Sequence, residues 1–407
     1  MSHMSFVSRH RLVSWAAILG TAAGALAACS NLAPAPPDEA TRSAGTSASS
    51  TASAGATGTT GAGAAPAGTV VRPRARWVPA RWNDLPGWDA DHLAELGPAL
   101  GRGCERPPPA WTATCGELRA RAADGWTDEA LRAWAQQRLQ PYRVESLEGD
   151  TEGLATGYFE PYVEATRRPQ GPFRYALHAP PADLTPQKPW WSRQQIDTLA
   201  VARRALQGRE LAFVRDRLDL LVLQVQGSGR VLVTEVDGTR HLVRMAFAGH
   251  NEQPYRSVGR WLVDQGELRL EQASWPAIRS WAALHPDRVT EMLWSNPRYV
   301  FFREEPLPDP DVGPRGAQGV PLTPGRSIAV DPQSIPYGSI VWADTTEPLS
   351  ATPLRRAVMA QDTGSAITGA VRADWFWGWG AQAEAQAGRM KQPLRLWVLW
   401  PKSAPPA

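Results

Sequence analysis

The sequence predicts a mainly β protein with few short helices, built from a small closed barrel and a second β unit. Beyond Gly319, short apolar runs alternate with Pro/Gly turns, which is typical of a barrel of short strands. These runs are Ser327–Val330, Ser339–Trp342, Arg356–Gln361 and Arg395–Trp400. Within residues 163–262, the alternating runs Arg230–Val236 and His241–Met245 are joined by Asp237-Gly238, a hairpin signal. A chain of 407 residues has room for both units.

Residues 1–28 are interpreted as a lipoprotein signal peptide. A basic stretch around Arg9 precedes the apolar run Leu12–Ala25, which is too short to span a membrane. The run ends in Leu26-Ala27-Ala28-Cys29, which resembles a bacterial lipobox, with cleavage before Cys29 and a lipid on its thiol. An ordinary cleaved signal with a chance Cys is the alternative. Because Ser30 follows the Cys, we expect an outer-membrane lipoprotein facing the periplasm.

Residues 29–72 predict a flexible tether between the membrane and the folded part. This stretch consists largely of Ala, Gly, Ser, Thr and Pro and has almost nothing to bury. A flexible chain of about 40 residues has a mean reach on the order of 35 Å. That reach suits a globular domain held off a membrane surface.

Before residue 163, the pattern predicts one helix and one strand. Thr127 is a plausible N-cap for a helix that runs through Gln140, with Pro141 as its stop. Ala155–Tyr162 is a β-type run that contains Pro161 near its end.

The predicted second unit also contains a helix and an apolar strand. Ser192 with Gln195 forms a capping box for a helix. Leu218–Val225 is strongly apolar and is interpreted as a strand that ends at Gln226-Gly227-Ser228-Gly229. We interpret the latter as a sharp turn that lets a ligand approach the backbone, in preference to a nucleophilic Ser, because the pattern is not Gly-x-Ser-x-Gly.

Two short helices and a strand are expected next. Ser274 with Pro276 opens the first helix and Asp287 caps the second. Tyr299–Phe302 then begins a strand.

Composition excludes several classes of function. The formal charge of +3 is small and the arginines are dispersed, so we expect no nucleic-acid partner. No Cys-x-x-Cys or His-Glu-x-x-His pattern occurs, so we expect no metal and no cofactor. In an oxidising compartment, a disulfide between Cys104 and Cys115 is favoured over two free thiols. The 19 Trp suit either a core or stacking on sugar rings.

Three aspartates, Asp331, Asp362 and Asp374, gather in the last third of the chain among Gly, Pro and short apolar runs. A single Asp in such a setting is usually a turn residue. Asp374, however, precedes Trp375-Phe376-Trp377, and desolvation by aromatic neighbours raises the pKa of a carboxyl group. A carboxyl that is protonated at neutral pH can donate to a leaving oxygen, as a glycosidase acid must. The other two would then be ligands, orienting groups or a second carboxylate.

A polar loop, Gly249–Gly259, offers amide and hydroxyl donors that suit sugar hydroxyls. It can equally be a turn whose polar groups satisfy one another, and the residues alone leave both interpretations open.

From Gly157 to Pro401, the sequence resembles the lytic murein transglycosylase A family, including its three-aspartate domain. Order and spacing both fit over roughly 60% of the chain. The matching stretches are Gly157-Tyr158-Phe159-Glu160-Pro161, Val225-Gln226-Gly227-Ser228-Gly229, Pro254-Tyr255-Arg256-Ser257-Val258-Gly259, Asn296-Pro297-x-Tyr299-Val300-Phe301-Phe302, Gly319-Val320-Pro321-Leu322, Ile328-Ala329-Val330-Asp331 and Gln361-Asp362-x-Gly364 through Asp374.

The resemblance implies a double-psi β-barrel formed by residues 73–162 and 263–407, interrupted by an inserted β domain at 163–262. A glycan strand of peptidoglycan would lie in a groove between them. The implied reaction is non-hydrolytic cleavage of the β-1,4 bond between N-acetylmuramic acid and N-acetylglucosamine, which leaves a 1,6-anhydro end.

The resemblance also assigns roles to single residues. Asp374 is expected to act as the catalytic acid and then as the base. Asp362 is expected to line the groove, and Asp331 to be structural. The expected substrate-binding residues, which would face the sugars from the other wall or lie beside the acid, are Thr156, Tyr158, Gln226, Ser228 and Trp375.

Two departures from the family pattern accompany this resemblance. Thr368 stands where the family commonly has Lys, which removes a cation near the site. Asn251-Glu252 stands where the family commonly has Asn-Gly. Two other functions stay open: a two-carboxylate hydrolase that pairs Asp374 with Asp362 or Glu160, and a non-catalytic peptidoglycan-binding lipoprotein.

Overall fold

A computed structural model describes residues 66–121 and 125–406. The predicted signal peptide, Cys29 and most of the predicted tether lie outside these residues. The last residues of the 29–72 tether do not fit that prediction, because β1 (Val70–Val71) pairs with β2 (Arg76–Pro79). Val70 and Val71 are the first valines after the small residues of this stretch, and valine favours strands.

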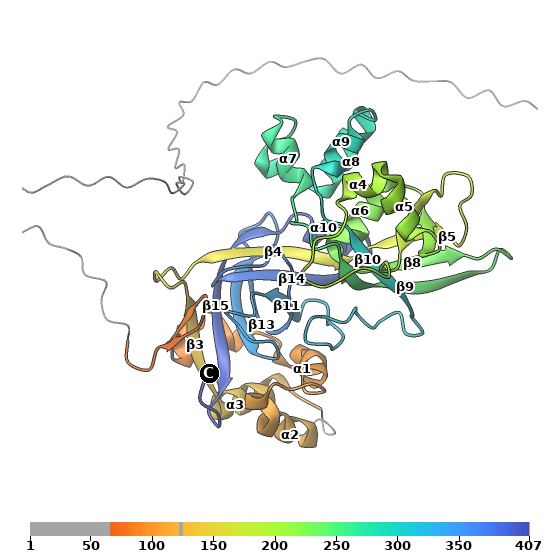
Figure 1. Ribbon diagram of the computed structural model, residues 1–407. Coiled ribbons are helices and arrows are strands. Elements are labelled where there is room, and N and C mark those ends of the chain that lie inside the picture. The colour runs from red at the N-terminus through yellow and green to blue at the C-terminus, as the bar shows by residue number, and fades with distance from the viewer. Residues whose placement is uncertain (1–65, 122–124, 407) are drawn as a thin grey trace, which may run out of the picture. The chain divides into compact units, whose positions relative to one another are not determined.

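Six strands close a barrel, which confirms the predicted β class (Figure 1). The ring closes because β4 pairs with β14 on one side and with β15 on the other. Around the ring the order is β15 (Lys391–Pro401), β12 (Ile340–Thr346), β13 (Pro353–Asp362), β11 (Ser327–Val330), β14 (Arg372–Trp379) and β4 (Gly153–Glu160). β3 (Leu139–Glu145) extends the sheet from β15 toward β2 and β1.

The barrel is filled by apolar side chains that alternate with outward-facing ones along each strand. Its core contains Ile328, Val341, Ala360, Trp375 and Val398, each at most 3% exposed. On β14, Ala373 and Trp375 lie in the core, whereas Asp374, between them in the sequence, faces the opposite side. The same strand therefore contributes both to the core and to the opposite face.

Three helices cover one side of the barrel: α1 (Gly97–Gly103), α2 (Thr112–Arg121) and α3 (Asp128–Arg138) (Figure 1). The expected disulfide between Cys104 and Cys115 is present and buried among these helices. Thr127 caps α3 as predicted. The helix ends at Arg138, however, and not at the predicted Gln140. Pro141 lies within β3, where it is opposite Leu399 of β15.

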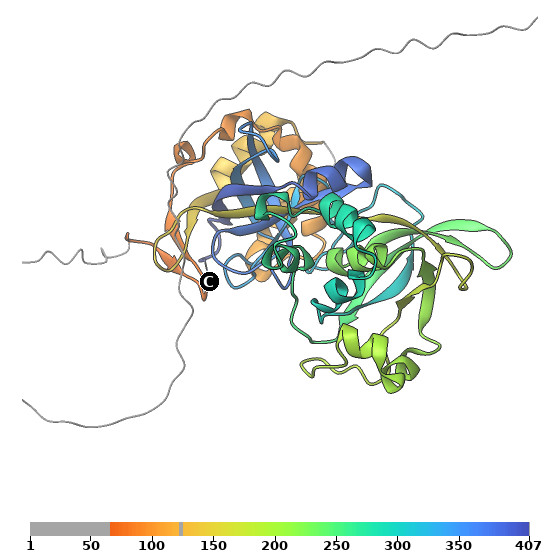
Figure 2. The same ribbon diagram turned by 90° about the horizontal axis from the view of Figure 1, so that it is seen from above.

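A second sheet of six strands forms the inserted unit (Figure 2). Its order is β10 (Val300–Pro306), β9 (Arg240–His250), β8 (Gly229–Thr234), β5 (Tyr162–Thr166), β7 (Glu210–Val214) and β6 (Tyr175–His178). β8 and β9 form the predicted hairpin. Because β10 pairs with β9, the sheet extends past the expected boundary at residue 262. The chain enters this sheet at Pro161, between β4 and β5.

The predicted strand Leu218–Val225 is wrong, because these residues belong to helix α6 (Arg217–Gln226). Asp216 caps the helix by accepting a hydrogen bond from the Leu218 N–H, and Gly227 ends it at a φ of +82°. α6 packs against both the sheet and neighbouring helices, and six of its ten residues are apolar. Such a short apolar run shows no period that distinguishes a helix from a strand.

The remaining helices match the predicted start signals with one small shift. Ser192 and Gln195 form the capping box of α4 (Arg193–Thr198), and Ser274 caps α8. α9 follows Arg288, one residue later than the predicted cap at Asp287. The other helices are α5 (Ala200–Leu206), α7 (Val258–Asp264), α8 (Trp275–Leu284), α9 (Val289–Trp294) and α10 (Gly380–Ala387). Among the described residues, none of these helices is both long and apolar enough to cross a bilayer.

A buried cluster of charges sits where the chain passes from the barrel to the second sheet. Glu160, 1% exposed at the end of β4, accepts hydrogen bonds from Arg230 Nε at 2.9 Å and Arg244 Nε at 2.6 Å. Both arginines also donate to the carbonyl of Val312, in the segment that returns to the barrel. The cluster therefore ties β4, β8, β9 and the return segment together.

We expect Glu160→Gln to lower the free energy of unfolding by about 3–5 kcal/mol, because it leaves two buried guanidinium groups without their counter-charge. Urea unfolding followed by tryptophan fluorescence measures this loss. The matched control is Glu164→Gln, which removes an ion pair with Arg240. Both side chains of this pair are about half exposed, so the substitution should change the free energy of unfolding by under about 1 kcal/mol. Equal effects of the two substitutions would contradict a special role for the buried cluster.

Candidate active site

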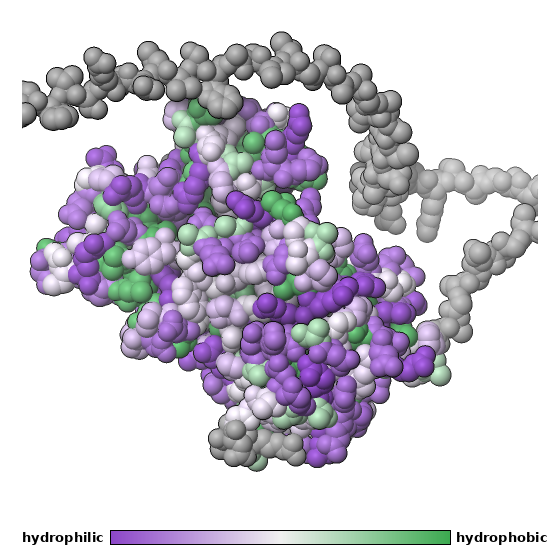
Figure 3. Space-filling model, turned by 180° about the vertical axis from the view of Figure 1, so that it is seen from behind, coloured by the Kyte–Doolittle hydropathy of each residue, from purple (hydrophilic) through white to green (hydrophobic). Residues whose placement is uncertain are grey.

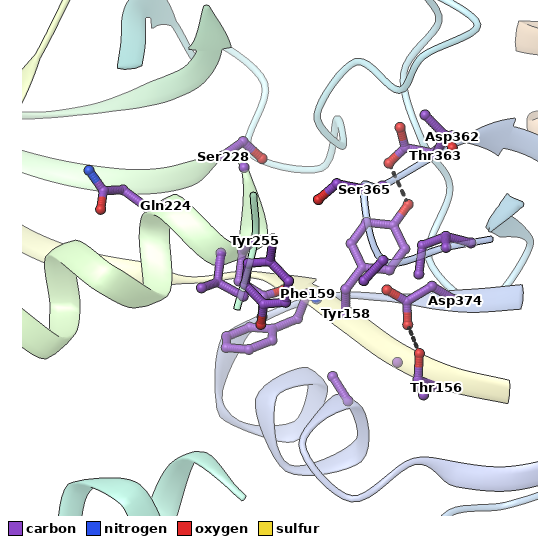
Figure 4. Close-up of a pocket in the computed structure, with 18 of the residues that line it drawn as sticks. Thr156, Tyr158, Phe159, Gln224, Ser228, Tyr255, Asp362, Thr363, Ser365 and Asp374 are labelled. Atoms are coloured by element: carbon purple, nitrogen blue, oxygen red, sulfur yellow. Dashed lines mark hydrogen bonds between the residues drawn. The ribbon is translucent and has the colours of Figure 1, made fainter. Parts of the chain in front are cut away.

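A groove of about 1080 Å³ runs between the two sheets and contains most of the predicted site residues. One wall comes from β4, β14 and the segment after β13. The other comes from the end of α6, from β9 and from the loop that carries Tyr255 (Figure 4). The surface seen in Figure 3 is mostly hydrophilic, with small scattered hydrophobic patches.

Asp374 lies in this groove at a position determined by strand register. It is directly opposite Thr156, because β14 and β4 run parallel and pair Asp374 with Thr156. The Thr156 hydroxyl donates to Asp374 Oδ1 at 2.5 Å, and Arg372 Nη2 donates to the same hydroxyl oxygen at 2.8 Å. Arg372 precedes Asp374 by two residues, so both side chains lie on the same face of β14.

The surroundings of Asp374 act on its pKa in both directions. Burial raises the pKa above the ordinary value of a carboxyl group, while the Thr156 hydrogen bond and the charge of Arg372 lower it by less. Because Oδ1 already accepts the Thr156 proton, a proton on Asp374 belongs on Oδ2. The hydrogen-bond chain therefore determines which oxygen can act as an acid.

Asp362 ends β13 on the same wall of the groove. Its Oδ2 accepts from the Tyr158 hydroxyl at 2.8 Å, and its Oδ1 accepts from the Ala317 N–H at 2.9 Å. Burial raises its pKa to about 6, although these hydrogen bonds lower it. Burial, together with Asp362, likewise raises the pKa of Tyr158, which therefore keeps its proton.

Asp331 has the geometry of a turn residue and does not line the groove. Its two oxygens accept backbone N–H groups, from Gln333 at 2.9 Å and from Gly369 at 2.8 Å. Arg74 Nη1 approaches it at 3.4 Å. Asp331 thus joins the segment after β11 to the loop that precedes β14.

Trp375 was expected to bind substrate, and the structure contradicts this. Its side chain is 1% exposed and packs in the barrel core. Strand alternation explains the difference, because neighbours on β14 face opposite sides and Asp374 faces the groove. Phe376, two residues beyond Asp374, is the aromatic residue of this strand that lines the groove.

The four other predicted contact residues line the groove, but not all on the wall opposite the aspartates. Thr156 and Tyr158 stand beside Asp374 and Asp362 and bond to them. Gln226 and Ser228 come from the inserted unit, and Gln226 Oε1 accepts the Phe159 N–H at 3.1 Å. Between Thr156 and Tyr158, a Cβ on Gly157 would lie 2.7 Å from Trp377 Nε1, so this position excludes a side chain.

One part of the polar loop satisfies its own polar groups as a turn does, and another part lines the groove. The Asn251 side chain is fully buried and bonds to backbone groups of Trp191, Pro297 and Tyr299, so it is structural. Tyr255 lines the groove. Glu252 has a φ of +52°, a conformation that favours glycine.

Sequence reasoning missed several groove residues: Arg298, Arg303, Arg315, Arg372, Phe376 and Lys391. Arg372 and Phe376 had a usable signal, since each is two residues from Asp374 and shares its strand face. The others lack one, because loops and distant strands bring them to the groove. Glu160 was a candidate second carboxylate, yet it does not line the groove and is held by two arginines. Within residues 66–121 and 125–406, no three His, Cys, Asp or Glu side chains are placed to share a metal ion.

The sequence and fold match those of known lytic murein transglycosylases. Residues 154–303 match the MltA specific insert domain, and residues 326–400 match the 3D domain. The membrane-bound lytic murein transglycosylase A of Escherichia coli strain K12 is 32% identical over 291 residues, which are 69% of this chain and 75% of the relative. The chain therefore belongs to the membrane-bound lytic murein transglycosylase A family, whose fold is a double-psi β-barrel with an inserted domain.

Solved structures support this assignment. The lytic transglycosylase LtgG of Burkholderia pseudomallei is 43% identical, with a TM-score of 0.56, covering 83% of this chain and all of that one (100%). The structure of MltA from E. coli with bound chitohexaose is 25% identical, with a TM-score of 0.63, covering 82% of this chain and 96% of that one.

The raised pKa of Asp362 makes stability depend on pH. Because the folded pKa, about 6, lies above the ordinary value of 3.8, the folded state holds the proton more tightly. The resulting stabilisation is complete below pH ~4 and is lost as the pH rises through about 6. Asp362→Asn, which cannot ionise, should therefore match the parent protein at pH 4 and exceed its stability by up to about 3 kcal/mol at pH 8. Urea unfolding at both pH values tests this, and a variant no more stable than the parent at pH 8 would contradict it.

Proposed function

We propose that this protein is a lytic transglycosylase of peptidoglycan in which Asp374 alone serves as acid and then as base. The observation that carries the proposal is the half-buried Asp374 in the groove. One of its oxygens accepts from Thr156, and the other has no hydrogen-bond partner among the described residues. Family membership supports the reaction class. The chitohexaose bound to MltA of E. coli supports an amino-sugar polymer as the ligand.

The reaction begins with proton transfer from Asp374 Oδ2 to the glycosidic oxygen, and the bond between that oxygen and C1 of the muramic acid breaks. The C6 hydroxyl of the same sugar then bonds to C1, and Asp374 Oδ2 takes its proton. The products are a 1,6-anhydromuramic end and a free 4-hydroxyl on the N-acetylglucosamine. No water is consumed, and Asp374 ends protonated, as it began.

Each neighbouring group has a role that follows from its contacts. Thr156 and Arg372 hold Asp374 Oδ1, which leaves Oδ2 for both proton transfers. Burial raises the pKa of Tyr255, so it keeps its hydroxyl proton and can donate to a sugar oxygen. Asp362 lines the groove beside Tyr158, whereas Asp331 holds the turn before β14.

The arrangement favours this reaction over a two-carboxylate hydrolase. A hydrolase needs a second carboxylate that is free to activate water or attack the sugar. Both oxygens of Asp362 are already hydrogen-bonded, and Glu160 is committed to its two arginines. A non-catalytic binding protein, in turn, has no need of an acid whose pKa is raised by burial.

We further propose that Cys29 carries a lipid that anchors the protein in the outer membrane, as the lipobox pattern and Ser30 indicate. The curated relatives are named membrane-bound, which supports attachment to a membrane. Fatty-acid labelling in cells should mark the parent protein and should fail with Cys29→Ala. Labelling that survives this substitution would refute the anchor.

Asp374→Asn and Asp374→Ala should each lower the rate of product release from purified sacculi by at least about a hundredfold, because they remove the proton donor. Mass spectrometry of the muropeptides identifies the reaction, since anhydro ends are one water lighter than reducing ends. Reducing ends would identify a hydrolase. Tight binding without products, unaffected by either substitution, would identify a binding protein.

Thr156 provides a graded comparison for Asp374. Thr156→Val keeps the shape but removes the donor to Oδ1, so kcat should fall by about tenfold or more. Loss of that bond also raises the pKa of Asp374, which should move the basic limb of the rate profile to higher pH. Thr156→Ser keeps the hydroxyl and should retain both the rate and the profile.

A further inference from the structure

The groove contains many more positive than negative side chains. Six cations line it, but only two carboxylates, Asp362 and Asp374, do so among the described residues. Arg260 and Arg303 are paired with carboxylates outside the groove, Asp264 and Glu305, each at 2.7 Å. The cations that have no carboxylate partner among residues 66–121 and 125–406 are Arg298, Arg315, Arg372 and Lys391.

Arg298 is the best-positioned of these four. Its backbone N–H donates to Asn296 Oδ1 at 3.2 Å, and its carbonyl accepts from Arg193 Nη2 at 2.7 Å. Its Nε donates to the Gln253 carbonyl at 2.8 Å. The two terminal nitrogens have no hydrogen-bond partner among the described residues. A guanidinium held by Nε with both terminal nitrogens free is oriented for bidentate binding of a carboxylate.

The neighbours of Arg298 do not neutralise it. His250 lines the groove beside it, and burial followed by the charge of Arg298 lowers the pKa of this His. The Glu252 N–H donates to His250 Nδ1 at 3.0 Å, so that nitrogen is an acceptor and the ring is neutral. Burial lowers the pKa of Arg298 and the charge of the Glu252 carboxylate acts against it, but among the described residues no ion pair joins the two.

Arg298 lines the same groove as the reacting group. Tyr255 and Asp374 are also part of its lining (Figure 4). Burial has the largest effect on the pKa of Tyr255 and raises it, while the charge of Asp374 raises it further and that of Arg298 lowers it.

The sugar units of a glycan strand do not explain such a cation. N-Acetylglucosamine is neutral, and neutral sugars are bound by amides, hydroxyls and aromatic rings. The anionic groups of peptidoglycan are the carboxylates of the stem peptides, which hang from the lactyl group of each muramic acid. We propose that Arg298 binds a stem-peptide carboxylate next to the cleaved bond, so that the enzyme prefers peptide-bearing strands to naked ones; this rests on the proposed function.

The test compares two substrates of the same glycan length. The first is strands with intact stem peptides. The second is strands from which an amidase has removed the peptides and in which the lactyl carboxylates that this exposes have been capped as amides. For the full-length protein, kcat/KM should be about tenfold or more higher on the peptide-bearing strands, the size of a charge-assisted bidentate contact. Arg298→Gln should reduce this ratio toward one. Arg298→Lys keeps the charge but not the planar fork, so it should give an intermediate ratio. This result would show that the site tolerates substitution.

The matched control is Arg256→Gln. Arg256 is exposed, belongs to the same loop as Tyr255 and does not line the groove, so its removal changes the net charge equally. The ratio should stay at the parent value. Thermal unfolding of every variant reports whether it is folded.

The outcomes separate this inference from the proposed function. Equal cleavage of both strands by the parent protein, or equal changes of the ratio in Arg298→Gln and Arg256→Gln, would overturn the peptide site while anhydro products still supported the reaction. Reducing ends, with the preference for peptide-bearing strands retained and dependent on Arg298, would refute the transglycosylase reaction and support the peptide site.

Discussion

The buried ion cluster around Glu160 is the contact on which the groove depends. Isolated buried charges are costly, so Glu160, Arg230 and Arg244 must keep one arrangement in which each is paired. That arrangement joins the end of β4 to the hairpin β8–β9 and to the segment that returns to the barrel. Arg230 also stacks over Trp379, 3.7 Å from the ring centroid, at the end of β14. The two strands that carry Thr156 and Asp374 are thus tied to the wall that faces them.

Strand alternation divides chemistry from packing on β14. Arg372, Asp374 and Phe376 face the groove, whereas Ala373 and Trp375 fill the barrel. The aromatic residue next to Asp374 in sequence is therefore not what desolvates the acid. The burial that raises its pKa comes from the walls of the groove, and the parallel register with β4 supplies the opposing contribution from Thr156. The pKa of Asp374 thus depends on two strands that are more than 200 residues apart in the chain.

The two walls of the groove suit different parts of a branched polymer. The barrel wall supplies Asp374 and its hydrogen-bond chain, which the proposed mechanism applies to a glycosidic bond. The inserted unit supplies Tyr255, Ser228 and the fixed guanidinium of Arg298. Arg372, on the barrel wall, supplies a positive charge bonded to Thr156. Its contact with Thr156 places that charge behind the acid.

The sequence alone determined the β class, the hairpin, most helix caps and the disulfide partners, and it singled out Asp374 as a candidate site residue, because turn residues, caps and ordered motifs are local signals. It did not determine the state of Leu218–Val225, since a run buried on all sides shows no period. It also placed Trp375 in the groove wrongly, because the sequence does not show which residues of β14 face the groove and which face the core. Only the tertiary structure decided which residues share the groove, because Thr156, Asp374 and Arg298 come from separate segments. The pKa of Asp362 and the free terminal nitrogens of Arg298 likewise depend on burial and on the presence or absence of partners, which exist only once the chain has folded.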